Sequence, residues 1–259
     1  MQLPYYVVDS FTSSVFTGNP AGVCMLDEWL SDETMQRIAA ENRLSETAFL
    51  VGGHGRYDLR WFTPEVEVDL CGHATLASAF VLLRDYEHAA DRLDFNTKAG
   101  MLTVVRDGDR LAMDFPSRPA EACAAPEALV RGLGMPPNQV LRCRDYLAVF
   151  DTEEDIRRIA PDITALNELD CLAIIITAPG KHADFVSRVF APRAGVDEDP
   201  VTGSTHCTLI PYWAEKLAKR KLHARQLSRR GGEIFCEYRD DRCIIAGHAA
   251  LYLRGTIML

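Results

Sequence analysis

The chain has 259 residues, 47% of them hydrophobic, and a formal net charge of −9 at pH 7. This length can bury one large core or two smaller ones. The acidic balance argues against nucleic acid or an anionic membrane surface as the main partner. No apolar stretch is long enough to span a membrane, and the first residues do not resemble a signal peptide, so we expect a cytoplasmic protein.

Short strands and two helices are predicted in the first half of the chain. The predicted strands cover residues 5–11, 23–26, 44–51, 57–62 and 65–70, and a hairpin covers 99–115 with its turn at Asp107-Gly108. Ser31 is a favourable N-cap for a helix that ends near Asn42. Glu46 falls where this helix gives way to a strand. It is either a solvated surface residue or a carboxylate at a cavity mouth, where partial burial would raise its pKa and suit it to carry a proton.

The second predicted helix follows Gly72. Only Thr75 and Ser78 are polar between Ala74 and Leu83, so this helix has no polar face and should be buried. Its first turn presents backbone N–H groups and the positive end of the helix dipole. A small carboxylate could bind there, or protein groups and water could cap the amides.

The eight cysteines form no Cys-x-x-Cys pair and no Cys/His cluster with zinc-site spacing. We therefore expect no metal site and mostly reduced, buried thiols. Cys71 immediately precedes the start of the buried helix, where a thiolate is favoured. A buried, inert thiol is the alternative for this residue.

The second half of the chain predicts a similar mixture after a linker at 116–126. The predicted elements are a helix at 127–133, strands at 146–150 and 171–177 with a helix near 153–159 between them, a helix or strand at 182–190, a helix at 204–218 and strands to the C-terminus. Pro211 should kink the helix at 204–218 or mark a later start for it.

Landmarks in the two halves recur at a nearly constant spacing. Gly72 and Gly203 each precede an apolar helical run and lie 131 residues apart. Two further pairs lie 132 residues apart, namely Gly100 with Gly232 and the turn Asp109-Arg110 with Asp241-Arg242. We therefore predict two copies of one unit, at 1–117 and 118–259, with the last strand, 251–259, as a candidate to pair back with the first unit.

Four segments resemble, in order and spacing, the signature segments of the PhzF-like family, which is named for a phenazine-biosynthesis isomerase. They are Asn19-Pro20, Leu44-Ser45-Glu46-Thr47-Ala48-Phe49, Asp69-Leu70-Cys71-Gly72-His73-Ala74-Thr75 and Asp199-Pro200-Val201-Thr202-Gly203-Ser204. The resemblance implies an α+β fold similar to diaminopimelate epimerase and proline racemase. In that fold two pseudo-symmetric units, each a mostly antiparallel sheet around a central buried helix, flank an active-site cleft.

The resemblance also implies a cofactor-independent isomerase that moves a proton between carbons of a small carboxylic acid. Glu46 resembles the family's catalytic acid/base, and His73 and Asp199 resemble residues that hold the substrate and assist the transfer. The candidate substrate-binding residues are Asn19, Cys71, Gly72, Thr202, Gly203 and Ser204. No metal, nucleotide or prosthetic group is expected, and a homodimer is plausible by resemblance.

Physical chemistry supports these roles but leaves alternatives open. The helix dipole disfavours a cationic His73, which suits a neutral hydrogen-bond partner, although a simple turn residue is the alternative. Asp199 could instead only stabilise its helix. The related epimerases use two opposed cysteines, one at each helix start, and Cys71 resembles one of them. Thr202 or its glycine neighbour occupies the place of the other, and a threonine hydroxyl is too weak an acid/base near neutral pH, so a racemase with two thiols is disfavoured. A racemase that uses Cys71 with Glu46, and a catalytically silent protein that binds small acids, both remain open.

Overall fold

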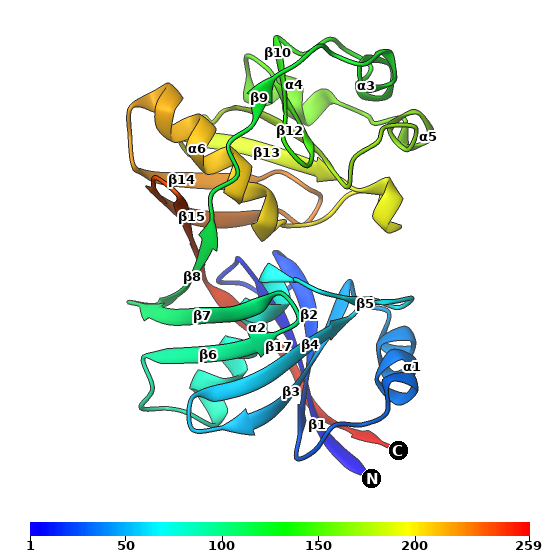
Figure 1. The fold of residues 1–259 in the computed structure, drawn as a ribbon, viewed down its shortest axis with the longest axis vertical. Coiled ribbons are helices and arrows are strands. Elements are labelled where there is room, and N and C mark those ends of the chain that lie inside the picture. The colour runs from blue at the N-terminus through cyan, green and yellow to red at the C-terminus, as the bar shows by residue number, and fades with distance from the viewer. The chain divides into compact units, whose positions relative to one another are not determined.

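The computed structural model describes residues 1–259. It divides into unit 1, which contains Met1–Asp114 and Ala246–Leu259, and unit 2, which contains Phe115–Ile245. Strands dominate both units and helices are few, so the predicted α+β class is confirmed (Figure 1). None of the helices is both long and apolar enough to cross a membrane.

Unit 1 is a mixed sheet. Its strands are β1 (Gln2–Ser10), β2 (Asn19–Leu26), β3 (Glu46–Gly53), β4 (Arg56–Phe62), β5 (Glu67–Val68), β6 (Arg92–Thr97), β7 (Gly100–Asp107), β8 (Arg110–Pro116) and β17 (Ala249–Met258). The strands pair in the order β17, β1, β2, β3, β4, β6, β7 and β8, and the short β5 pairs with the end of β4. The β2/β3 and β4/β6 pairs are parallel, and the others are antiparallel.

The two helices of unit 1 are α1 (Asp32–Asn42) and α2 (Gly72–Asp85). The predicted cap of α1 is confirmed, because the Ser31 side chain accepts a hydrogen bond from the Thr34 N–H at 3.2 Å. The predicted burial of α2 is also confirmed, since all but three of its residues are buried. The helix packs against β1, β2, β3 and β17, whereas α1 lies on the outer side of the unit (Figure 1).

Two buried hydroxyl groups show how α2 tolerates an apolar environment. The Thr75 hydroxyl donates to the carbonyl of Cys71 at 2.6 Å, and the Ser78 hydroxyl donates to the carbonyl of Ala74 at 2.7 Å. Each hydroxyl group therefore finds its hydrogen-bond acceptor on its own helix, so α2 can be buried without a polar face.

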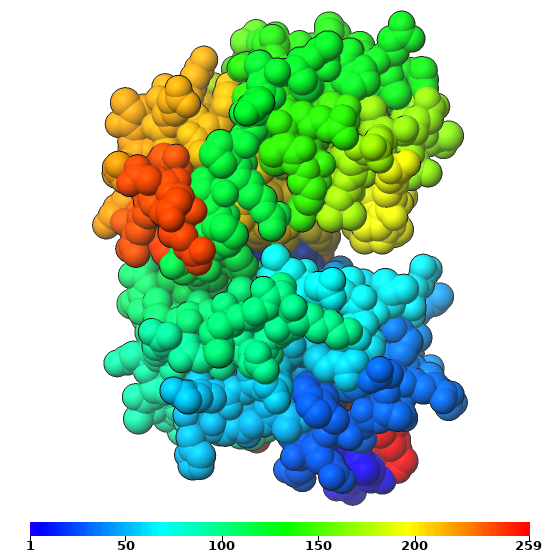
Figure 2. Space-filling model, in the orientation of Figure 1, coloured from blue at the N-terminus to red at the C-terminus, as the bar shows by residue number.

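The first and last strands of the chain lie side by side in unit 1. β1 pairs with β17 along its length, and the Leu259 N–H donates to the Met1 carbonyl at 2.9 Å. Both chain ends consequently reach the same region of the surface, where they appear in blue and red (Figure 2).

Unit 2 repeats the strand order of unit 1. Its elements are β9 (Glu121–Ala122), α3 (Glu127–Leu133), β10 (Gln139–Arg142), β11 (Tyr146–Val149), α4 (Glu153–Arg158), α5 (Ile163–Leu166), β12 (Ile174–Pro179), β13 (Phe185–Phe190), η1 (Pro192–Ala194), η2 (Gly203–Thr205), α6 (His206–Leu217), β14 (Lys221–Gln226), β15 (Gly232–Arg239) and β16 (Arg242–Gly247). β9 to β15 pair in numerical order, with β11/β12 and β13/β14 parallel and the other pairs antiparallel. The same alternation of parallel and antiparallel pairs therefore occurs twice in the chain.

Several local features differ from the sequence-based expectations. Within the undecided segment 182–190, Phe185–Phe190 forms strand β13, and the predicted strand at 65–70 is reduced to β5. The elements β6, β10 and α5 were not predicted. Pro211 lies inside α6 and does not mark its start. The carbonyl of Cys207, whose helical partner the proline removes, instead accepts a hydrogen bond from the Arg118 N–H at 2.8 Å.

Candidate active site

Three of the candidate residues in unit 1 form a compact polar cluster. Glu46 is the first residue of β3, and Cys71 and His73 flank Gly72 at the start of α2. Glu46 Oε2 lies 3.2 Å from His73 Nε2, and Cys71 Sγ lies 3.4 Å from His73 Nδ1. The imidazole therefore has the carboxylate beside one ring nitrogen and the thiol beside the other.

The sheet positions this cluster. The parallel β2/β3 register places Glu46 beside Ala21, and the hydroxyl of Ser10 on β1 donates to the His73 carbonyl at 2.8 Å. Asn19 is fully buried at the start of β2, directly opposite Ser10. The first turn of α2 is thus held against the ends of two strands, close to Asn19.

The start of α2 has no side-chain cap. Cys71 is in an extended conformation at the N-cap position, and its side chain accepts no hydrogen bond from the helix. The positive end of the helix dipole therefore lies beside the Glu46–His73 pair.

Burial keeps the His73 imidazole neutral. The side chain is 7% exposed, and burial lowers its pKa to about 4, although a hydrogen bond with the backbone of Pro20 acts in the opposite direction. The two facing atoms, Glu46 Oε2 and His73 Nε2, are themselves buried. Glu46 is 19% exposed and so keeps some access to solvent.

The candidate residues in unit 2 form a second polar cluster around a buried glutamine. The Thr202 hydroxyl donates to the Asp199 carboxylate at 2.5 Å, and the Thr202 N–H donates to Gln226 Oε1 at 2.9 Å. Gln226 Nε2 in turn donates to the Asp199 carbonyl at 2.8 Å. Gln226 therefore holds the segment that leads into α6 in a defined conformation.

Gln226 was missed by the sequence-based interpretation. It is fully buried at the end of β14, on the same face as Leu222 and Ala224. A polar residue that continues an alternating apolar face is a detectable signal, because buried amides require hydrogen-bond partners.

The helix start of unit 2 differs from that of α2. Gly203 and Ser204 lie in the 3-10 turn η2, and α6 begins only at His206. Nδ1 of His206 lies 2.9 Å from the Thr202 carbonyl oxygen. Burial lowers the pKa of this imidazole to about 4. A neutral, buried His206 that donates to this carbonyl holds the turn η2 against the start of α6.

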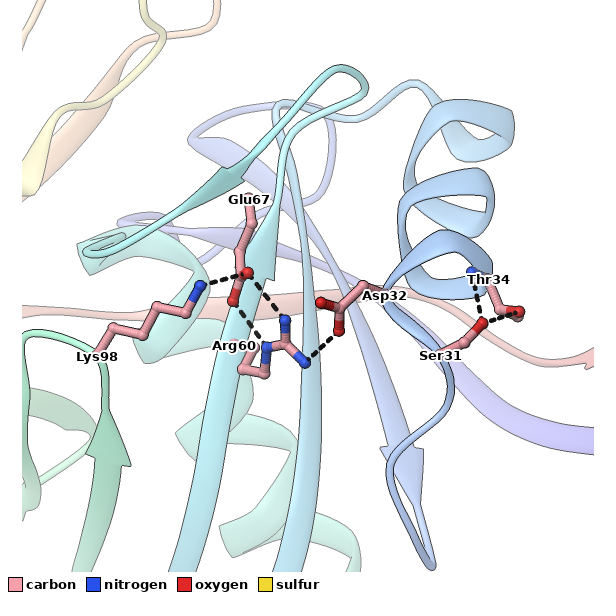
Figure 3. A network of polar contacts seen from close by, with 6 residues as sticks. All are labelled: Ser31, Asp32, Thr34, Arg60, Glu67 and Lys98. Carbon is pink, nitrogen blue, oxygen red and sulfur yellow. Dashed lines mark hydrogen bonds and ion pairs between the residues drawn. The ribbon is translucent and has the colours of Figure 1, made fainter.

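Each helix start is preceded by an arginine–glutamate pair. In unit 1, the Arg60 guanidinium donates to both oxygens of Glu67 at 2.7 and 2.8 Å, and it also binds Asp32 (Figure 3). In unit 2, the Arg188 guanidinium donates to both oxygens of Glu198 at 2.7 and 3.0 Å. Both glutamates precede the helix-start glycine by five residues.

Comparison with known proteins identifies the family. The family model described as phenazine biosynthesis-like protein, PhzC-PhzF, matches residues 8–255. This chain belongs to that family. The family resemblance predicted from the four sequence segments is therefore confirmed.

Similar proteins cover the whole chain. A Pseudomonas aeruginosa protein named "Uncharacterized isomerase PA2770" is 52% identical and covers 100% of both chains. The human phenazine biosynthesis-like domain-containing protein is 38% identical over 99% of each chain. A PhzF-family crystal structure from Enterococcus faecalis has a TM-score of 0.98 at 45% identity over 100% of each chain.

The fold also occurs outside the family. A probable proline racemase from Agrobacterium radiobacter has a TM-score of 0.66 at 10% identity, covering 99% of this chain and 93% of that one. At this identity the similarity concerns the fold alone, and it agrees with the racemase-like fold implied by the resemblance.

Proposed function

We propose that this PhzF-family protein is an isomerase that moves a proton between two carbon atoms of a small carboxylic acid, with Glu46 as the general acid/base. Isomerase chemistry is supported by the family and by relatives that are named isomerases at 46–52% identity. The observation that carries the catalytic assignment is the 3.2 Å approach of Glu46 to a buried, neutral His73 at the uncapped start of α2.

The proposed mechanism follows from this geometry. Ionised Glu46 removes a proton from carbon, and the negative charge that develops on the substrate is stabilised by the N–H groups at the start of α2. His73 does not compete for the proton, because burial lowers the pKa of its imidazole to about 4. Glu46 then returns the proton to the second carbon atom.

We further propose that Asn19 in unit 1 helps to bind the acid, and that Asp199, Thr202, Gly203 and Ser204 in unit 2 form a second group of residues suited to bind a small acid. The hydrogen bonds of Gln226 to the backbone of Asp199 and Thr202 support this role, because they fix the polar groups before a ligand binds. Polar groups that are already fixed lose less conformational entropy when a ligand binds.

A second candidate function is a racemase or epimerase in which Cys71 acts with Glu46. It is supported by the 3.4 Å distance between Cys71 Sγ and His73 Nδ1, which places the thiol directly beside the imidazole. It predicts deuterium at the α-carbon of an amino acid, loss of optical activity and loss of both signals in Cys71→Ser.

The test is deuterium exchange in a panel of small carboxylic acids, followed by NMR in deuterated buffer. Glu46→Gln should reduce exchange by about 10²- to 10⁴-fold, the usual contribution of a general acid/base. Glu41→Gln, on the exposed face of α1, is the matched control and should exchange like the wild type. Unchanged exchange in Glu46→Gln would exclude the mechanism, and binding without exchange in the wild type would favour a silent acid-binding protein.

A further inference from the structure

The Glu46–Cys71–His73 cluster contains the three side-chain types that bind zinc in proteins. We propose that this cluster binds one thiophilic divalent cation, such as Zn²⁺ or Cd²⁺, as an inhibitory ligand rather than as a resident cofactor. The thiolate, imidazole and carboxylate would supply three of four tetrahedral positions, and water or a carboxylate ligand would supply the fourth.

The distances suit a small cation. One donor atom from each side chain lies within 4.8 Å of the other two. Around a tetrahedral zinc ion with bonds of about 2.0–2.3 Å, ligand atoms are separated by about 3.3–3.6 Å. The Sγ–Nδ1 distance of 3.4 Å is already in this range, and Glu46 Oε2 lies 3.2 Å from the other ring nitrogen, Nε2.

Those two short distances involve different ring nitrogens, and one cation can take only one of them. Since the three donor atoms lie within 4.8 Å of one another and would be about 3.6 Å apart around the cation, the third ligand must move by about 1 Å. Glu46 is the side chain with most freedom to do so, since it is partly exposed while Cys71 and His73 are buried.

The charges of the cluster also match a divalent cation. A Cys71 thiolate and the Glu46 carboxylate together carry two negative charges, and the His73 imidazole is neutral, so the loaded site has no net charge. The start of α2 favours the thiolate form, and a net-neutral complex avoids the unfavourable interaction of a cation with the helix dipole.

Binding of the cation can be measured without a substrate. The reduced, chelator-treated protein should bind one equivalent of Cd²⁺ at this site, with a thiolate-to-cadmium charge-transfer band in the ultraviolet. Cys71→Ser should lose that band, whereas the matched control Cys123→Ser, at an exposed cysteine, should keep it. Glu46→Gln should weaken the affinity by more than about tenfold, since even loss of a partner that only orients a ligand typically costs that much.

The proposal fails if one equivalent of Cd²⁺ produces no thiolate band, or if Cys71→Ser, shown to be folded by circular dichroism, keeps the wild-type band and affinity. Inhibition of deuterium exchange by Zn²⁺ is a further expectation that rests on the proposed function. If Glu46 is not the acid/base, exchange would survive Glu46→Gln while the cadmium titration would remain as described, so the two failures are distinguishable.

Discussion

The two units share a scaffold but differ at the residues that could carry chemistry. Both have the same alternation of parallel and antiparallel strand pairs, and both place a buried helix after the strand that carries the arginine. The arginine–glutamate pairs also match, and each guanidinium lies over a phenylalanine two residues further on, at 5.2 Å for Phe62 and 5.0 Å for Phe190. The repeat therefore includes interactions that position the helix starts.

The side chains at the equivalent functional positions are different. Glu46 opens β3, whereas Ile174 opens β12 and is buried. Likewise, Cys71-Gly72-His73 in unit 1 corresponds to Thr202-Gly203-Ser204 in unit 2. One unit thus carries a carboxylate, a thiol and an imidazole at these positions, and the other carries hydroxyl groups.

Breaking the two arginine–glutamate pairs should give the largest stability effects and should reveal whether they are equivalent. Arg188→Met should cost about 3–5 kcal/mol, because the guanidinium is buried and also donates to the carbonyls of Ile156 and Ile159. Arg60→Met should cost less, about 1–3 kcal/mol, because this arginine is more exposed and Glu67 keeps its contact with Lys98. Urea unfolding measures both, and equal losses would show that burial is not the deciding factor.

The neutral histidines make both helix starts sensitive to acid. The pKa of His73 and of His206 is lowered by burial to about 4. The unfolded chain therefore binds more protons between pH 6.5 and 4, so this stability is complete above pH 6.5 and is lost as the pH falls towards 4. Each histidine should account for about 3 kcal/mol over this window.

Urea unfolding of His206→Gln between pH 4 and 8 tests this pH dependence. The variant should lose about half of the histidine-dependent slope, and His54→Gln, in an exposed loop, should keep all of it. A wild-type slope in His206→Gln would contradict the assignment.

A smaller difference is expected between the hydrogen bonds that hold the two helix starts. Gln226→Ala should cost about 2 kcal/mol, because it leaves the Thr202 N–H and the Asp199 carbonyl without their partner. Ser10→Ala removes only the hydroxyl that donates to the His73 carbonyl and should cost about 1 kcal/mol. Denaturant midpoints for the two variants compare them directly, and a larger loss in Ser10→Ala would reverse the expected order.

Sequence patterns were sufficient to predict the elements that are determined by local interactions. The Ser31 cap, the helix Glu127–Leu133 and the buried α2 follow from capping residues and apolar periodicity within a few turns. Gly72 at the start of α2 and Gly203 at the start of η2 were also visible as paired landmarks, because they lie 131 residues apart.

Only the tertiary structure decided features that depend on distant partners. Phe185–Phe190 forms a strand because β12 and β14 lie on either side of it, and Gln226 is buried because the Asp199–Thr202 segment folds over it. Likewise, Glu46 is separated from Cys71 by 25 residues, and no short motif shows that the two approach the same imidazole. Local sequence determines which residues start helices and strands, whereas strand pairing and packing determine which of their side chains meet.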